Sequence, residues 1–319
     1  MEGHWTRDDA LAAGQVFEDR VWALLMEQSR GHLHVFRPLL DRGVDALLHR
    51  LSDGAYIPVQ AKGRSSLRGG QVQLLVNAAS VIDDFVVIIG GEVVDGGVGP
   101  TMLVIPTSDF RRLALLTSAR GLSEYSMSFG MRPRANTRWL TWLVSSDRLV
   151  ERFGVPLALP AVALPEERPR LRRGPLGFLG EAEVIRRLAE AEHLNLFRPF
   201  PDSETVELAV RHLSNGHVVG LQIKTVSVDA VNPNRPVDIY MSSFRPAPTT
   251  YFTVVAWIPE KRSFHDQCLV IPSEELLLFA TPDGSHYKFE FNPDPVKQHH
   301  LDKYRRHLTD LCSEIDSLL

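Results

Sequence analysis

Two glutamine–lysine pairs lie in apolar surroundings at distant places in the 319-residue chain. Gln60 and Lys62 belong to the run VQAK, and Gln222 and Lys224 belong to the run LQIK. Because side chains alternate between the two faces of a strand, each glutamine should point the same way as its lysine. The chain has six lysines against 29 arginines, and these are its first two lysines. Lysine at both places in such an arginine-rich chain suggests a task for a compact point charge, which a planar guanidinium cannot perform.

Two acidic residues accompany each pair. Asp45 precedes the first glutamine by 15 residues, and Glu207 precedes the second glutamine by the same 15 residues. Glu18 and Glu181 lie earlier, each on the flank of the apolar face of a helical stretch. Mg²⁺ takes oxygen ligands, can polarise a phosphate and lowers the pKa of a bound water. Two carboxylates, an amide oxygen and an ammonium group at one end of a sheet therefore suit metal-assisted hydrolysis of a phosphodiester.

The two halves of the chain repeat each other beyond these residues. The run HLHVFRP at 32–38 returns as HLNLFRP at 193–199, and LVIP follows both lysines at similar distances. Collinear matches at several places predict an internal duplication. We expect one domain at 1–152, a second at 176–319, and a linker at 153–175 whose prolines and arginines make it semi-rigid.

Hydrophobic periodicity predicts the elements that would position the polar residues. A helix over 7–29, stopped by Gly31, precedes three strands that include HLHVFRP, VDALLHRL and YIPVQAKG. The turns SDGA and SNGH carry Asp-Gly and Asn-Gly, which predict hairpins before each lysine strand. We expect each half to end in a helix, over Trp139 and Trp142 in the first and over 301–318 in the second. Whether a helix follows the lysine strand stays open. The fold class is α/β, with a mixed central sheet flanked by helices in each domain.

The composition excludes several classes of protein. With 44% hydrophobic and 23% charged residues and a net charge of -4, the chain is globular, and neither histone-like nor a polybasic membrane binder. Its two cysteines, Cys268 and Cys312, provide neither a disulfide framework nor a CxxC zinc site. The polar N-terminus and the lack of an apolar run near ~20 residues argue against a signal peptide or a membrane span. We expect a cytoplasmic protein without a membrane partner.

These motifs resemble the PD-(D/E)xK nuclease superfamily, in the variant whose last motif is QxK. The run GVDALLHRLSDGAYIPVQAKGR is most similar to the Mrr-type restriction endonuclease and Holliday-junction-resolvase branch. The resemblance covers about 14–106 and 177–272. It implies two tandem restriction-endonuclease-like domains that cleave phosphodiester bonds with Mg²⁺, for which Mn²⁺ can substitute. Double-stranded DNA is the expected partner, and defence against foreign DNA or DNA repair the expected setting.

The resemblance also implies a role for each residue of the set. Asp45 and Gln60 would bind the metal with help from the Ala61 carbonyl, Lys62 would act on the nucleophilic water, and Glu18 would complete the site. In the second half the same positions are filled by Glu207, Gln222, Lys224 and Glu181. Fusing two such domains would build covalently the two-site arrangement that these nucleases commonly reach by dimerising. We therefore expect a monomer with pseudo-two-fold symmetry or a homodimer.

Two departures from the family pattern leave alternatives open. Glu207 stands where the family has an aspartate, and its longer arm could shift or weaken the metal, so the second site could be degenerate. Asp41 and Asp202 are rivals for the metal-binding acid in the two halves. The alternative to a nuclease is a nuclease-derived module that binds nucleic acid or protein with one or both sites inert. An RNA-directed enzyme is a third possibility.

Structural interpretations exist for the same residues. Lys62 and Lys224 could extend from a sheet edge into solvent. The acids could form ion pairs with Arg37 and Arg198, which lie in the repeated FRP segments. Exposed arginines such as Arg132 could be solvated or contact phosphate, because binding to the nucleic-acid backbone depends on local charge.

Overall fold

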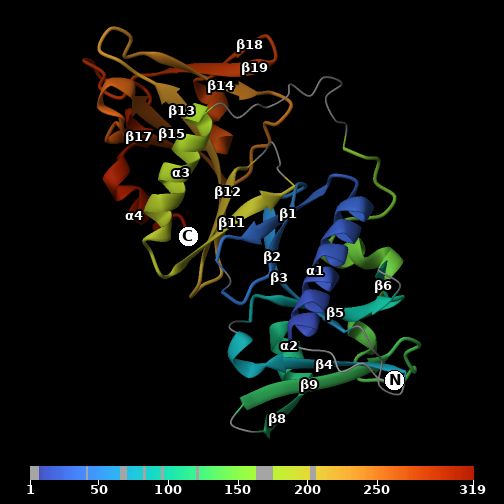
Figure 1. Ribbon diagram of the computed structural model, residues 1–319. Coiled ribbons are helices and arrows are strands. Elements are labelled where there is room, and N and C mark those ends of the chain that lie inside the picture. Colours follow the sequence, from blue (N-terminus) through green and yellow to red (C-terminus); the bar gives the residue numbers. More distant parts are fainter. Residues whose placement is uncertain are drawn as a thin grey trace. The chain divides into compact units, whose positions relative to one another are not determined.

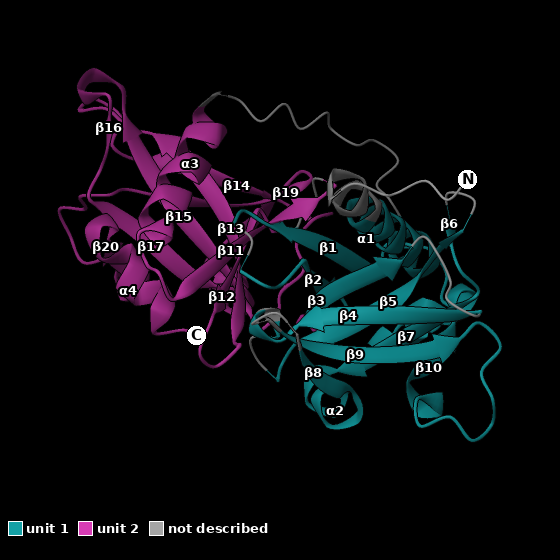
Figure 2. Cartoon of the chain, turned by 60° about the horizontal axis from the view of Figure 1, so that its bottom comes forward, with its two compact units in different colours: residues 1–52, 56–162 teal, residues 53–55, 163–319 magenta. Residues whose placement is uncertain are grey.

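The computed structural model describes residues 7–40, 42–64, 70–81, 84–94, 97–119, 122–162, 175–201 and 206–319. Its contacts define two compact units, which Figure 2 distinguishes by colour. Unit 1 comprises residues 1–52 and 56–162, and unit 2 comprises 53–55 and 163–319. Asp41, Asp202 and positions 163–174 of the expected linker lie outside the described residues. In the described part of the chain, no helix combines the length and the apolar character needed to cross a membrane.

A mixed sheet forms the centre of unit 1. Its strands are β1 (Leu33–Pro38), β2 (Ala46–Arg50), β3 (Ala55–Arg64), β5 (Val87–Val94), β7 (Thr101–Pro106) and β10 (Leu143–Ser145). They follow the order β10-β7-β5-β3-β2-β1, and the short β6 (Gly97–Val98) pairs with β5. β3 and β5 are parallel, whereas β1 with β2, β5 with β7 and β7 with β10 are antiparallel. The glutamine–lysine pair therefore lies on a strand at the middle of the sheet.

Helix α1 (Arg7–Ser29) packs against one face of this sheet (Figure 1). Phe17 and Leu25 of the helix share a core with Val59 and Ala61 of β3. Gly63 permits the close approach, because a Cβ added there would collide with the Phe17 side chain. Alternation along β3 then directs Gln60 and Lys62 to the opposite face from the residues beneath α1.

A small antiparallel sheet covers the other face of unit 1. It has the order β4-β9-β8, with β4 (Gln71–Asn77), β8 (Leu115–Ala119) and β9 (Leu122–Gly130). Val72 and Leu74 of β4 pack on Ile88 of β5 and Leu103 of β7. The remaining elements are α2 (Thr107–Leu113), η1 (Ala78–Ser80), η2 (Leu140–Trp142) and η3 (Ser146–Phe153). Unit 1 thus has three layers, one helical and two of sheet.

The strand order of unit 2 matches that of unit 1. Its central sheet has the order β20-β17-β15-β13-β12-β11, with β13 and β15 parallel and β16 paired to β15. The strands are β11 (Leu194–Phe200), β12 (Leu208–His212), β13 (Val218–Ser227), β15 (Thr250–Ile258), β16 (Ser263–Phe264), β17 (Gln267–Pro272) and β20 (Arg305–His307). A second small sheet, β14-β19-β18, comprises Arg235–Tyr240, His286–Phe291 and Thr281–Asp283.

Helices α3 (Pro175–Ala189) and α4 (Leu311–Asp316) complete the layers of unit 2. Val184 and Leu188 of α3 pack on Leu221 and Ile223 of β13, and α4 joins the same core. The small sheet packs on the opposite face, where Phe289 shares a core with strands β15 and β17. The short helical turns are η4 (Pro259–Lys261), η5 (Ser273–Leu278), η6 (Asp302–Tyr304) and η7 (Leu308–Asp310).

The α/β class with a mixed sheet and flanking helices is confirmed, and so is the stop of the first helix. α1 ends at Ser29, and Gly31 adopts a φ of 88°. The segment after the lysine strand, left open above, includes strand β4 in unit 1 and β14 in unit 2.

The helix expected over Trp139 and Trp142 is wrong, and the helix expected over 301–318 is present only in its last part, as α4. The segment with Trp139 and Trp142 contains only the short η2 before edge strand β10, which pairs with β7. The segment 301–318 contains edge strand β20 between η6 and η7, and only six residues form α4. In both segments, strand pairing with the central sheet overrides the apolar spacing that suggested a helix.

Residues 153–162, expected as the start of the linker, pack on unit 1. Phe153 and Val155 are buried in the same core as α1. Helix α3 of unit 2 then begins at Pro175. The proline-rich character of this region therefore coexists with buried anchor residues.

Candidate active site

Asp45 is held at the entrance to β2, directly across from the lysine strand. Its N–H donates to the Val59 carbonyl at 3.0 Å, and its Oδ2 accepts the N–H of Ala61 at 2.8 Å. Lys62 Nζ lies 3.7 Å from the same Oδ2. Asp45 precedes β2, which begins at Ala46, rather than lying within the strand as expected. The backbone of β3 therefore fixes a carboxylate beside the lysine.

Gln60 and Lys62 share a face of β3 but differ in exposure. Gln60 is 3% exposed, whereas about a third of the Lys62 side chain is accessible. Lys62 lies in register with Gly90 of the parallel strand β5. Part of the Lys62 side chain therefore reaches solvent. Its ammonium group nevertheless lies beside the Asp45 carboxylate, so the side chain does more than extend into water.

Glu18 approaches this pair from helix α1. Phe17, the preceding residue, packs over Gly63 and so brings that turn of the helix to the end of β3. The pKa of Glu18 is raised to about 7, first by burial and then by the negative charge of Asp45, with Lys62 and Arg37 opposing the shift. The helix carboxylate and the strand carboxylate therefore interact electrostatically.

The second site reproduces the contacts of the first. The Glu207 N–H donates to the Leu221 carbonyl at 3.0 Å, and Glu207 Oε2 accepts the N–H of Ile223 at 2.9 Å. Lys224 Nζ lies 3.8 Å from Glu207 Oε1. Gln222 is 2% exposed on the same strand. The longer side chain of glutamate thus reaches the same backbone amide as the aspartate of unit 1.

The helix glutamate of the second site has a different environment. Glu181 is 5% exposed, and Arg198 Nη2 donates to its Oε2 at 2.8 Å. The corresponding arginine of unit 1, Arg37, lies 3.2 Å from Asp19, and its charge opposes the rise in the pKa of Glu18. The ion pairs expected from the sequence concerned Asp45, Glu207 and Glu18, whereas the structure places the Arg198 guanidinium against Glu181.

The two sites also differ beyond the lysine. In unit 1, Arg64 of β3 lies in register with Glu92 of β5, whereas unit 2 has Val226 and Ala256 at those places. Glu92 is buried, and burial raises its pKa. Sequence reasoning missed Glu92, although an acid inside the apolar run VVIIGGEVV is a signal for it. Unit 1 thus keeps charged residues next to its site where unit 2 is apolar.

A separate cluster in unit 2 joins His193, His212 and Asp316, whose ligand atoms lie within 4.8 Å of one another. His193 Nε2 is 3.0 Å and His212 Nε2 is 3.6 Å from Asp316 Oδ1. The N–H of Ser214 donates to His212 Nδ1, which leaves the proton of a neutral ring on Nε2, the nitrogen that a metal would need. We interpret these contacts as structural, because they join Asp316 of α4 to His212 of β12 and to His193, which precedes β11. No spacing motif marks it in the sequence.

Comparison with protein-family models and with curated proteins finds no match for this chain. Among solved structures, the chain is similar to a bacterial homing endonuclease, I-Ssp6803I, with 14% sequence identity and a TM-score of 0.32. That similarity covers 44% of this chain and 92% of the endonuclease. Similarity at this level does not define the fold or the activity of this chain.

Proposed function

We propose that this protein is a metal-dependent nuclease made of two PD-(D/E)xK-like domains, with DNA as its substrate and the working site in unit 1. The observation that carries the proposal is the contact set that recurs in both units. The amide between the glutamine and the lysine donates to a carboxylate on the neighbouring strand at 2.8 or 2.9 Å. The ammonium group lies 3.7 or 3.8 Å from that carboxylate. Repetition of this set argues against a chance ion pair, and in unit 1 the carboxylate of Glu18 adds the group that the chemistry would also need.

The donor set of the first site fits a hard divalent cation. Glu18 and Asp45 offer carboxylate oxygens, Gln60 an amide oxygen and Ala61 a carbonyl, all of the type that Mg²⁺ and Mn²⁺ accept. Burial and, after it, the negative charge of Asp45 raise the pKa of Glu18, so the two carboxylates repel each other and a cation would relieve that repulsion. When bound, Mg²⁺ would polarise the phosphate and lower the pKa of a bound water.

The residues of unit 1 then have separate tasks. Asp45, fixed by the Ala61 amide, orients its carboxylate without a conformational search. Lys62 places one positive charge where it can orient the attacking water and stabilise negative charge on the phosphate oxygens. Ionised Glu18 supplies the second carboxylate of the site, and its proton must leave before it can contact a cation.

A second candidate function, binding without hydrolysis, applies to unit 2. The Arg198 guanidinium lies against Glu181, so a cation at that carboxylate would have to displace an existing positive charge. Glu207 also departs from the family aspartate. Together these features favour a unit that retains the fold and the lysine contact but does not perform the chemistry.

Cleavage of a supercoiled plasmid in Mg²⁺ or Mn²⁺ tests this proposal. We expect Lys62→Ala to lower the rate by about 10²–10³-fold, the usual cost of removing one group that stabilises transition-state charge. Lys224→Ala should change the rate by less than about three-fold, since unit 2 does not hydrolyse the substrate. The matched control is Lys297→Ala, which removes an exposed lysine of unit 2.

The outcomes separate the two candidate functions. Absence of cleavage by the wild type on both DNA and RNA, in either metal, would favour a binding module throughout. Equal losses in Lys62→Ala and Lys224→Ala would contradict the assignment of chemistry to unit 1. Binding of Mn²⁺, measured by titration calorimetry, gives a readout independent of cleavage, and we expect Asp45→Asn to weaken it.

A further inference from the structure

A basic pocket of about 640 Å³ opens at one end of the small sheet of unit 1. It lies between the start of β4 and the residues that follow β9, which include Arg132, Arg134 and Asn136. Both arginines are exposed, and among the described residues that line the pocket there is no carboxylate. A Cβ at Gly70 would meet no atom within 4 Å, so a ligand can approach the backbone there.

The chemistry of this pocket suits a phosphate group. Within the described part of the chain, neither Arg132 nor Arg134 forms an ion pair, so their charges are available to a ligand. Guanidinium groups match phosphate oxygens through paired N–H donors. Polar side chains such as Gln71 and Thr137 add neutral donors to the same wall. An oligoanion is therefore a better fit than a neutral or cationic ligand.

A short series of contacts connects the pocket to the first site. Arg64 lies two residues beyond Lys62 on the same face of β3, and its Nε donates to the Gln73 carbonyl of β4 at 3.1 Å. Gln71, two residues earlier on β4, lines the pocket. The strand path between Lys62 and the pocket comprises two residues of β3 and two of β4, about 13 Å at about 3.3 Å per residue, together with the reach of the Arg64 side chain.

The other side of the pocket is attached to the same edge of the central sheet. The Met131 carbonyl accepts the Thr101 hydroxyl at 2.6 Å. A Cβ at Gly99 would lie 3.2 Å from the Met131 sulfur and 3.5 Å from a carboxylate oxygen of Glu92. The loop that carries both arginines is therefore fixed to the strands beside the site.

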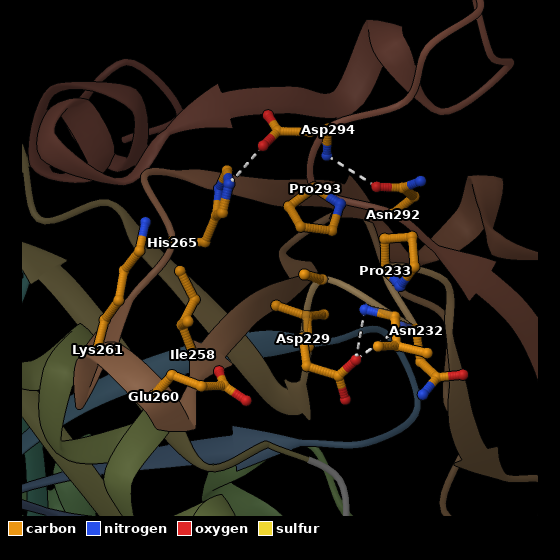
Figure 3. A pocket seen from close by; sticks show the side chains of 13 residues that line it. Asp229, Asn232, Pro233, Ile258, Glu260, Lys261, His265, Asn292, Pro293 and Asp294 are labelled. Atoms are coloured by element: carbon orange, nitrogen blue, oxygen red, sulfur yellow. Dashed lines mark hydrogen bonds and ion pairs between the residues drawn. The ribbon is translucent and has the colours of Figure 1, made fainter.

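Unit 2 has a pocket at the corresponding place, with the opposite charge (Figure 3). This cavity of about 710 Å³ is lined by residues that precede β14 and residues that follow β19 in the chain. The first pocket is lined in the same way by the start of β4 and the residues that follow β9. Its lining includes Asp229, Glu260 and Asp294 against a single lysine, Lys261. The Asp294 carboxylate oxygen Oδ2 accepts a hydrogen bond from His265 Nε2 at 2.8 Å. This lining therefore offers a phosphate more carboxylates than cationic groups, the reverse of the first pocket.

We propose that the Arg132–Arg134 pocket of unit 1 binds the phosphodiester backbone of duplex DNA that flanks the scissile bond, and that the acidic pocket of unit 2 does not. This inference rests on the proposed function and extends it, because it names the surface that positions the substrate. It also makes unit 1 the unit that positions the duplex for cleavage.

Fluorescence anisotropy of a 30-base-pair duplex in Ca²⁺, chosen to measure binding apart from cleavage, tests the inference. The test variant is Arg132→Glu with Arg134→Glu. The matched control is Lys261→Glu with Lys297→Glu, which makes the same change in charge on unit 2. We expect the test variant to bind the duplex at least ten-fold more weakly than the wild type. The slope of log K against the logarithm of the salt concentration should become shallower by about 1 to 2. The control should stay within about two-fold of the wild type.

Three results would overturn the inference. Wild-type affinity in the test variant, or an equal loss in the control, would show that the pocket does not hold the backbone. If the wild type cleaves the plasmid while either of these results is obtained, only the inference about the pocket is contradicted, and the proposed nuclease function is not. A wild type that neither binds nor cleaves DNA would overturn both. Circular dichroism of each variant separates loss of binding from loss of fold.

Discussion

The two sites share two hydrogen bonds to the strand backbone and a lysine contact, and they differ in what meets the helix carboxylate. In both units a strand amide donates to the acid beside the lysine. In unit 1 the arginine of the FRP segment contacts Asp19 and Glu18 interacts with Asp45, whereas in unit 2 Arg198 contacts Glu181 itself. The strand part of the site is thus a property of the hairpin, and the helix part varies independently of it.

The contact between helix and lysine strand differs in the same way. In unit 1 Phe17 of the helix packs over Gly63 of the strand. In unit 2 the small residue is on the helix, because Gly180 packs over Thr225. Each unit keeps one glycine at this crossing, but on opposite elements. Close approach of the helix to the lysine strand is therefore achieved twice with different side chains, and each glycine is matched only to its own partner.

The largest effect should come from filling one of these glycines. A Cβ at Gly63 collides with Phe17, so Gly63→Ala should lower the free energy of unfolding by about 3 kcal/mol or more. Gly14→Ala is the matched control on helix α1, where an added Cβ meets nothing, and it should be neutral or stabilising by up to about 1 kcal/mol. Urea denaturation measures both. Similar values for the two variants would show that the crossing is not tightly packed.

The next largest effect concerns the arginines. Arg198→Leu removes the guanidinium from buried Glu181, and we expect a loss of about 1–3 kcal/mol in the free energy of unfolding. Arg37→Leu breaks a contact between a half-buried arginine and the exposed Asp19, and it should cost about 0–1 kcal/mol. Adding Glu181→Gln to Arg198→Leu should recover much of the loss. If Arg37→Leu costs as much as Arg198→Leu, the two environments are equivalent and the comparison fails.

Much of the strand part of the site was accessible from the sequence. The shared 15-residue spacing encloses an Asp-Gly or Asn-Gly turn, and a tight turn sets the hairpin register that aligns Asp45 with the lysine strand. Alternation then places Gln60 and Lys62 on one face. Local chemistry and a period of two are sufficient for these predictions, because the residues lie on adjacent strands.

The helix part was not accessible, because it depends on packing between distant elements. Arg37 and Arg198 occupy the same place in a repeated segment, yet one contacts Asp19 and the other Glu181. No spacing rule distinguishes these outcomes, since helix rotation over the sheet decides which carboxylate is in reach. The same reason applies in part to Glu92, which lies in register with Arg64 on a separate strand.

A smaller effect, dependent on pH, should distinguish Glu18 from other helix acids. Its pKa of about 7 in the folded protein exceeds the ordinary value of 4.5, so ionising it destabilises the fold. This cost is nearly absent below pH 4.5, grows between the two values and is complete above pH 7. Glu18→Gln should therefore raise the melting temperature at pH 8 and much less at pH 5.

The control for this prediction is Glu27→Gln, which changes an exposed acid of the same helix. Millimolar Mg²⁺ should reduce the difference between wild type and Glu18→Gln at pH 8, because a cation offsets the repulsion between Glu18 and Asp45. An increase in melting temperature that is equal at pH 5 and pH 8 would contradict the assigned cause. No such Mg²⁺ effect is expected for Glu181→Gln, whose carboxylate already meets Arg198.

The smallest effect should come from exchanging the strand acids. Glu207 and Asp45 accept the same type of backbone N–H at 2.9 and 2.8 Å, although their side chains differ by one methylene. Glu207→Asp withdraws the carboxylate from the Ile223 amide, and we expect a loss of about 0.5–1.5 kcal/mol in urea denaturation. Cleavage should not change, because Arg198 still contacts Glu181. A gain in cleavage that depends on Lys224 would show that the length of this one side chain, and not the helix carboxylate, separates the two sites.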